Sequence, residues 1–306
     1  MKVRGVILKT ELSGLLPELR ERRALVRQGV IRPVGQWYVT AEAPADLVAV
    51  LGQGLRPTCL DAAALHGLWV PPSQGVHVYR PRATGDTVTG LALTPIRRRR
   101  EARSGQLVPR EDAATGRLCA PEPAVLHGSG LRSWPDSEPV PGIIMTLQHA
   151  ARCQSLVYAA ILIESALEQG ALRRAELHQV FEPLPGRLRE SLSRVRSDAQ
   201  SGTETAVRWW LEQRGVPVRS QVQILRGVRV DLLVGNTWVI ECDSRQFHDD
   251  PLQYQRDRER DLALAARGYR VTRLTWEQVF ITWENTTQML QEILRRREHR
   301  RALPAA

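Results

Sequence analysis

The chain has 306 residues, of which 42% are hydrophobic, so it is long enough and apolar enough for two or more domains with cores of their own. Its formal net charge is +10 at pH 7, which favours nucleic acid as a partner. The longest apolar run, residues 155–163, is too short to cross a membrane. The N-terminus also lacks the apolar core of a signal peptide, so we expect a cytoplasmic protein without a membrane partner.

The first segment, residues 1–42, has the pattern of a small helical unit that ends in a hairpin. Leucine and valine recur near helical spacing between residues 15 and 26, and Gly29 ends this pattern. Two short runs, 30–32 and 36–39, flank Pro33-Val34-Gly35 as a two-stranded wing. Helices followed by a basic wing predict a winged-helix DNA-binding region, although a solvated arginine face fits the same pattern. The residues expected to contact DNA are Arg20, Arg22, Arg23, Arg27 and Arg32.

The second segment, residues 43–145, predicts an α/β region with helices at 45–51 and 60–68 and a strand at 76–79. His66 lies in an apolar helical run, where a histidine is more often a packed residue than a catalyst. The stretch 84–142 is rich in Pro, Gly and Arg, which fits either β structure with long loops or a linker. The run Arg97-Arg98-Arg99-Arg100 within it is suited to phosphate binding and equally to a solvated loop.

The third segment, residues 146–200, predicts a helical connector. Its expected helices are a long one at 146–170 and shorter ones at 175–181 and 186–195.

The four cysteines are dispersed along the chain. They are Cys59, Cys119, Cys153 and Cys242. Zinc knuckles typically hold a pair of cysteines about two to four residues apart, and no such pair occurs here. The spacing therefore argues against a zinc site and predicts buried thiols of a cytosolic protein.

The last segment, residues 201–306, predicts helices and strands in the order α-β-β-β-α-β-α, so the fold class of the chain is α/β (α+β). Gly235-Asn236 marks the turn between the second and third strands. The expected elements are a helix at 203–213, strands at 218–225, 228–234 and 237–242, a helix at 253–267, a strand at 269–274 and a helix at 277–297.

Carboxylates lie on the second and third of these strands. Because side chains alternate along a strand, Glu241 and Asp243 share one face. A three-residue loop through Thr237 places Asp231 opposite Glu241, whereas a two-residue loop places it opposite Ile240. We predict the three-residue register or an equivalent bulge.

Charged carboxylates in apolar strands are costly unless a cation lies between them. The simplest such cation is Mg²⁺ or Mn²⁺, because hard cations take oxygen ligands. We expect Asp231 and Glu241 to bind the metal directly, with Glu204 reaching it from the preceding helix. Asp243 binds metal or orients water, and His248, which titrates near neutrality, is the expected proton-transfer group. Such a cluster predicts hydrolysis of phosphodiester bonds.

These residues resemble the Vsr-like (very-short-patch-repair endonuclease-like) domain of the PD-(D/E)XK nuclease superfamily. The resemblance rests on Glu204, Asp231, Glu241-Cys242-Asp243, His248, Tyr254, Asp257, Arg260-Asp261 and Gly268-Tyr269-Arg270-Val271. It implies a restriction-endonuclease-like αβββαβα core and Mg²⁺-dependent nicking or cleavage of DNA, with His248 as the catalytic histidine. Ser244 stands where that family usually has glycine.

The lysine of the superfamily is replaced by Asp243, as is typical of this branch. The chain has lysine only at Lys2 and Lys9, so no lysine near the cluster substitutes for it. Arginine is a poor proton donor because its pKa is too high, which leaves proton transfer to His248. Arg260, in the helix after the third strand, is expected to hold the scissile phosphate.

The front of the chain has a second resemblance. ELRERRALVRQGVIRPVGQWYV, followed by CLDAAALHGLW, is similar to the winged helix and following segment of AbiEi-type antitoxin and regulator proteins. The two resemblances together imply a DNA endonuclease of repair, restriction or phage defence. The alternatives are a DNA-binding, antitoxin-like transcriptional regulator with an inactive nuclease fold, and an RNA nuclease toxin. Cleavage of both strands of a duplex by a single-site enzyme often needs a homodimer or two successive nicks.

Overall fold

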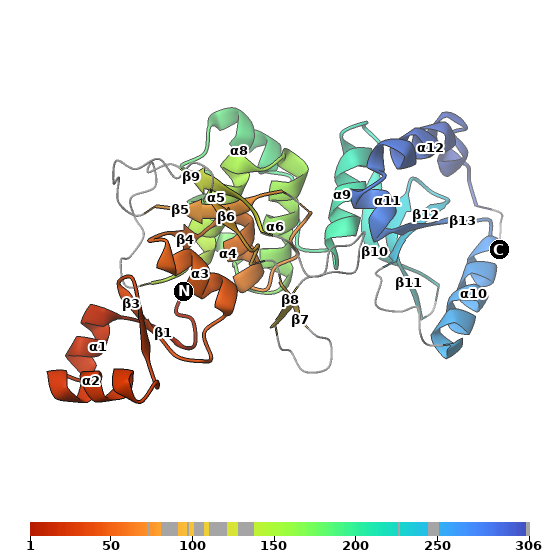
Figure 1. The fold of residues 1–306 in the computed structure, drawn as a ribbon. Helices are drawn as coiled ribbons and strands as arrows, with labels where there is room; N and C mark the ends of the chain where they lie inside the picture. The colour runs from red at the N-terminus through yellow and green to blue at the C-terminus, as the bar shows by residue number, and fades with distance from the viewer. Residues whose placement is uncertain are drawn as a thin grey trace. The chain divides into compact units, whose positions relative to one another are not determined.

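The computed structural model describes residues 1–72, 74–80, 91–96, 98–100, 107–109, 121–127, 138–225, 227–243 and 251–303. The chain forms two compact units (Figure 1). Unit 1 comprises Met1–Leu162 and Gln169–Ser193, and unit 2 comprises Ile163–Glu168 and Arg194–Ala306. No helix in these described ranges is long and apolar enough to span a bilayer.

The front of unit 1 contains the helices and hairpin expected for residues 1–42. Its elements are β1 (Val6–Leu8), α1 (Lys9–Leu15), α2 (Leu19–Arg27), β2 (Arg32–Val34) and β3 (Trp37–Val39). The strands form an antiparallel sheet in the order β1-β3-β2. The tight turn is Gly35-Gln36, with Gly35 at φ +52°, so it begins later than the predicted Pro33-Val34-Gly35. Gly29 ends α2 at φ +72°, as expected.

The rest of the α/β region contains a second sheet, in the order β4-β5-β9-β6, with β5 and β9 parallel. Its described elements are α3 (Ala45–Gly52), β4 (Arg56–Pro57), α4 (Cys59–Leu65), β5 (Val76–Tyr79), β6 (Ala92–Leu93), β7 (Arg98–Arg100), β8 (Leu107–Pro109) and β9 (Glu122–His127). Strands therefore occur within 84–142, although Arg97 and the side chains of 98–100 lie outside the described residues. One core joins Trp37 of the first segment to Leu47 and Val78 of the second.

The helical connector begins with two helices, so the prediction of one helix over 146–170 is wrong. They are α5 (Ile143–Cys153) and α6 (Leu156–Glu168). Gln154 has an extended backbone at ψ 165°, and the Ser155 hydroxyl accepts a hydrogen bond from the Tyr158 amide at 3.3 Å. Ser155 thus acts as an N-cap, which starts a new helix in the middle of the apolar pattern. The remaining connector elements are η1 (Arg174–Glu176), α7 (Leu177–Phe181) and α8 (Gly186–Leu192).

Unit 2 is built on a four-stranded sheet in the order β10-β11-β12-β13. Its elements are α9 (Gly202–Glu212), β10 (Val218–Leu225), β11 (Val228–Val234), β12 (Trp238–Asp243), α10 (Pro251–Ala265), β13 (Arg270–Thr275), α11 (Trp276–Phe280), α12 (Trp283–Arg295) and η3 (Glu298–Arg300). The first three strands are antiparallel, and β13 runs parallel to β12. Parallel neighbours need a crossover connection, and α10 lies in it (Figure 1).

The last predicted helix, 277–297, is also divided in two. Thr275 starts α11 directly after β13 through a capping box with Gln278. The chain then breaks at Ile281, and α12 places Trp283 edge-on against Trp210 of α9, with ring centroids 6.0 Å apart. The interruption contains neither Gly nor Pro, so the sequence offers no ordinary break signal there.

Candidate nuclease site

The hairpin between β11 and β12 has the register that a metal site requires. Val234 pairs with Trp238 and Leu232 with Ile240, which confirms the three-residue loop. The next pair in this register is Asp231 opposite Glu241. Asp231 also crosses to the neighbouring strand, because its Oδ2 accepts a hydrogen bond from the Cys242 amide at 2.8 Å.

A contact outside the hairpin explains why the three-residue loop forms. Gly235 has φ +58°, and a Cβ there would lie 2.4 Å from the carbonyl oxygen of His299. The Asn236 amide donates to that carbonyl at 2.8 Å. The loop is therefore packed on the C-terminal end of the chain at a position where only glycine fits.

Glu204 is positioned by the start of α9. The hydroxyl of Ser201 caps the helix by accepting from the Glu204 amide at 3.1 Å. The Glu204 carboxylate in turn accepts hydrogen bonds from the Ser201 hydroxyl at 3.0 Å and the Gln200 amide at 3.1 Å. The side chain is thus held beside the N-terminus of the helix, where negative charge is favoured.

A buried ion pair fixes the helix that carries Glu204. Arg208 of α9 and Glu164, both fully buried, are paired, and Arg208 also reaches Glu212 at 3.0 Å. Thr205 and Trp209 donate further hydrogen bonds to Glu164 at 2.8 and 3.2 Å. This network determines the rotation of α9 and therefore the direction in which Glu204 points.

Gln221 joins two of the acids and was not expected from the sequence. Its side-chain amide donates to Glu204 at 2.8 Å and to Asp231 at 3.2 Å. Its backbone has φ +52°, a conformation that is costly for a residue with a Cβ. Gln221 lies between Ser220, which pairs with Leu232, and Val222, which pairs with Val230, so the register of β10 on β11 brings it across from Asp231.

The pKa values of both glutamates are raised. Burial is the main cause for Glu241, which is 4% exposed, and the charge of Asp231 adds to it, so its pKa rises to about 8. Burial and the Asp231 charge likewise raise the pKa of Glu204 to about 7. Arg260 opposes the effect at Glu241, to which it donates at 2.7 Å, and so does Arg273. Burial and the Asp231 charge thus disfavour the charged forms of both glutamates, and a cation bound beside them would favour those forms.

The other predicted site residues have different surroundings. Arg260 lies against Glu241 and the Arg229 carbonyl. Asp243 is the last residue of β12, but its side chain and all of His248 lie outside the described residues. Arg22 is half-buried and donates to the carbonyls of Leu16 and Pro17 in the turn before α2. Of the arginines expected to contact DNA, those with exposed side chains are Arg20, Arg23, Arg27 and Arg32.

A comparison with protein families agrees with this geometry. Residues 204–294 match the profile of REase_MTES_1575, a restriction-endonuclease-like family. Unit 2 contains a restriction-endonuclease-like domain. The matched stretch begins at Glu204 and includes Asp231, Glu241 and Arg260. No curated protein and no solved structure matches the chain.

The match to this family suggests that the domain is a nuclease. Restriction-endonuclease-like nucleases usually use divalent metals, and the oxygen donors of this domain suit a hard cation. The compact metal-ligating group within the described residues, however, is a different one. It consists of Cys59, His77, His127 and Cys153 in unit 1, whose ligand atoms all lie within 4.8 Å of one another.

The expectation that the cysteines are all buried is wrong for Cys153. Cys153 is exposed, and its thiol lies close to the buried Cys59. The spacing of the cysteines along the chain gives no sign of this group, because its members come from four separate elements.

Proposed function

We propose that the protein is a Mg²⁺- or Mn²⁺-dependent endonuclease that hydrolyses phosphodiester bonds in DNA. The observation that carries this proposal is the juxtaposition of Asp231 and Glu241 across paired strands, with Glu204 linked to Asp231 through Gln221. These acids lie in a restriction-endonuclease-like domain, and burial beside the Asp231 charge raises the pKa values of both glutamates, an effect that a bound cation would oppose.

In this proposal Asp231 and Glu241 would hold the cation, and Glu204 would contact it directly or through water. The cation supplies an activated water and polarises the phosphoryl oxygen. Gln221 orients two of the acids, and Arg260 partly opposes the rise in the pKa of Glu241 and contacts the phosphate. Following the Vsr-like resemblance, we assign proton transfer to His248. Asp243 would bind metal or orient water.

We infer that the exposed arginines of the first segment contribute to DNA binding. Arg20, Arg23 and Arg27 lie on α2 and Arg32 on β2, and these positions fit the two basic surfaces of a winged helix. Phosphate contacts of this kind position a protein on DNA without specifying sequence. Repair, restriction and phage defence all suit such an enzyme, and a homodimer would allow both strands to be cut.

A second candidate is a DNA-binding regulator with an inactive nuclease fold. Two contacts favour it, because Gln221 bridges the acids and Arg260 is paired with Glu241 at positions where a cation would compete. Asp243 in place of the superfamily's lysine favours it as well.

One assay separates these candidates. The protein is incubated with single-stranded, duplex and mismatched DNA, and with RNA, with Mg²⁺ or Mn²⁺ or with neither. We expect divalent-ion-dependent cleavage of DNA that falls at least about 100-fold in Asp231→Asn and in Glu241→Gln, since each loses a charged oxygen donor.

The matched control is Glu284→Gln, which removes an exposed acid of the same domain and leaves cleavage unchanged. DNA binding without cleavage of any substrate supports the regulator instead. Cleavage of RNA alone identifies a ribonuclease.

A further inference from the structure

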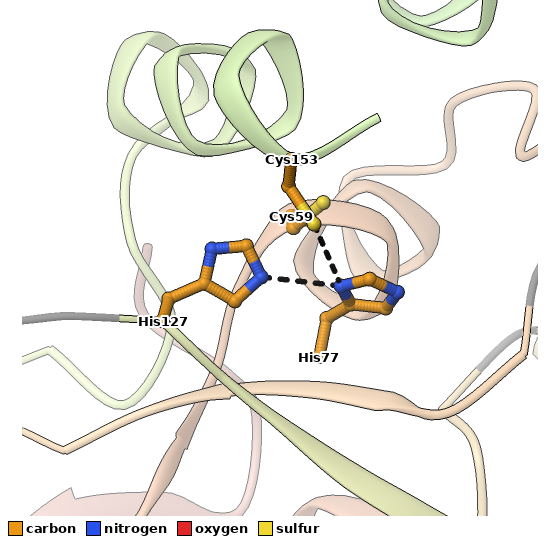
Figure 2. Close-up of side chains that lie close together, drawn as sticks. All are labelled: Cys59, His77, His127 and Cys153. Carbon is orange, nitrogen blue, oxygen red and sulfur yellow. Dashed lines mark hydrogen bonds between the residues drawn. The ribbon is translucent and has the colours of Figure 1, made fainter. Parts of the chain in front are cut away.

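Four side chains with soft or nitrogen donors converge in unit 1. Cys59 is the first residue of α4, His77 lies on β5, His127 ends β9 and Cys153 ends α5. Figure 2 shows the two rings and the two thiols pointing towards one another from these elements. His77 pairs with Val125 in the parallel register, so His77 and His127 share one face of the sheet.

The backbone holds two of these residues together independently of their side chains. The Thr58 amide donates to the His77 carbonyl at 2.9 Å. The buried Asp61 of α4 accepts from the His77 amide at 2.6 Å. The start of α4 and the middle of β5 are therefore fixed against each other, which places Cys59 beside His77 before any ligand is bound.

The distances between the donor atoms fit a tetrahedral metal centre. Zinc–nitrogen bonds of about 2.0–2.1 Å and zinc–sulfur bonds of about 2.3 Å place neighbouring tetrahedral donors about 3.3–3.8 Å apart. His77 Nδ1 lies 3.1 Å from His127 Nε2 and 3.6 Å from Cys153 Sγ. All four donor atoms lie within 4.8 Å of one another, so small side-chain movements suffice to complete the coordination.

Hydrogen bonding alone explains this arrangement less well. His77 Nδ1 has either one proton or one lone pair, yet both His127 and Cys153 approach it. His77 Nε2 is buried and has no hydrogen-bond partner, so the polar contacts of this ring are on the side that faces the cluster. The Gln154 side-chain amide also donates to both sulfurs, at 3.5 Å to Cys59 and 3.3 Å to Cys153. Such outer-shell donors stabilise thiolates in metal sites.

We propose that Cys59, His77, His127 and Cys153 bind one Zn²⁺ ion in the N-terminal unit, at a site separate from the nuclease carboxylates. Two sulfur and two nitrogen donors favour zinc over magnesium, which prefers oxygen. Four protein ligands complete a tetrahedral shell and leave no position for substrate, so the site is structural.

A structural zinc would account for the unusual backbone conformation of Cys59. Cys59 has φ +48°, and a non-glycine residue in this region is retained only where surrounding contacts impose it. The ion would join α4, α5, β5 and β9 at one point. We expect it to contribute directly to the folding free energy of unit 1, because an unfolded chain does not present the ligands together.

The test measures bound metal in the full-length protein, purified under reducing conditions and dialysed against buffer without chelator. We expect about one zinc per chain in the wild type by plasma mass spectrometry. Cys153→Ser and His127→Ala should retain almost none, whereas Cys153→His, which keeps four ligands, should retain zinc. The matched control His178→Ala removes an exposed histidine of the same unit and should leave the zinc content unchanged.

A second measurement does not depend on the folding of any variant. Co²⁺ added to metal-free wild type should give the visible absorption of a tetrahedral thiolate complex, and Zn²⁺ should displace it. The proposal is overturned if reduced wild type holds no zinc and gives no such spectrum. It is equally overturned if Cys153→Ser and His127→Ala retain as much zinc as His178→Ala, or if a Cys59–Cys153 disulfide forms in place of metal binding.

Discussion

The carboxylate cluster of unit 2 and the Cys/His cluster of unit 1 are assembled in opposite ways. Asp231 and Glu241 lie on consecutive strands of one hairpin, so strand alternation and a turn signal predict that they meet. Cys59 and Cys153, in contrast, are brought together by the packing of α4 against α5. A site can be predicted from sequence when its residues share a local motif. It cannot be predicted in this way when only tertiary packing brings its residues together.

The two clusters also have a feature in common. Three non-glycine residues in the described ranges have positive φ: Cys59, Gln221 and Arg297. Two of the three belong to the clusters. Each such conformation costs about 1–3 kcal/mol, and it persists where neighbouring structure imposes it, often at functional sites. Backbone strain therefore marks both regions, although their donor chemistry differs.

The two proposed sites should bind different ions, because their donor atoms differ. Oxygen donors favour Mg²⁺ or Mn²⁺, and thiolate with imidazole favours Zn²⁺. Changes in one region should therefore leave metal binding in the other intact, and the following experiments examine that independence.

Among the substitutions, the largest expected effect on stability comes from Glu164→Ala, which removes one partner of the buried ion pair that fixes α9. Breaking such a pair typically costs about 3–5 kcal/mol, and Arg208 retains Glu212, so we expect a loss of about 3 kcal/mol. Urea unfolding followed by tryptophan fluorescence measures it. Glu168→Ala, an exposed change on the same helix, should cost less than about 0.5 kcal/mol.

The zinc content of Glu164→Ala should remain that of the wild type, because the ion pair lies in unit 2. Loss of zinc in this variant would show that the two regions are not independent.

Gln221→Gly is expected to have an intermediate effect, on activity rather than on stability. Hydrogen bonds to a carboxylate favour its charged form, so their loss should raise the pKa of Glu204 above about 7. Cleavage at pH 7 should fall about 10-fold, as for other outer-shell residues, and recover towards pH 9. Glycine adopts φ +52° without strain, so the free energy of unfolding should change by less than about 1 kcal/mol.

The matched variant is Gln223→Gly, an exposed position on the same strand, which should leave the pH–rate profile unchanged. Equal pH–rate profiles for Gln221→Gly and the wild type would show that Gln221 has no role in the site.

The last expected effect is the pH dependence of stability. The folded-state pKa values of Glu204 and Glu241 are about 7 and about 8, and their ordinary value is 4.5. Between pH 4.5 and about 8 the folded state binds more protons than the unfolded state, so stability falls as pH rises through this window. Thermal unfolding at pH 5.5, 7 and 8.5 without added divalent ions should show this fall.

Mg²⁺ should reduce the decrease, since it binds the deprotonated acids. Glu241→Gln should also reduce it, because that variant has no proton to lose at this position. If stability decreases with pH by the same amount in Glu241→Gln as in the wild type, groups other than Glu241 cause the decrease.

Several elements were determined locally and could be predicted from the sequence. The strands β10 to β13 follow from alternating apolar residues, and the meeting of Asp231 and Glu241 follows from their places on β11 and β12. The register was predicted as the one that a metal site needs, but the contact that fixes it joins Gly235 to His299 at the far end of the chain. No local pattern contains that contact.

The remaining features were decided by tertiary structure. The break at Ile281 follows from the packing of Trp283 against Trp210, and the role of Gln221 appears only when β10 lies beside β11. The Cys/His cluster depends on four elements that meet in unit 1. The sequence by itself determined the periodic elements and the acids within one hairpin, because those depend on neighbouring residues. Folding decided which distant side chains share a site, because that depends on how helices and sheets pack.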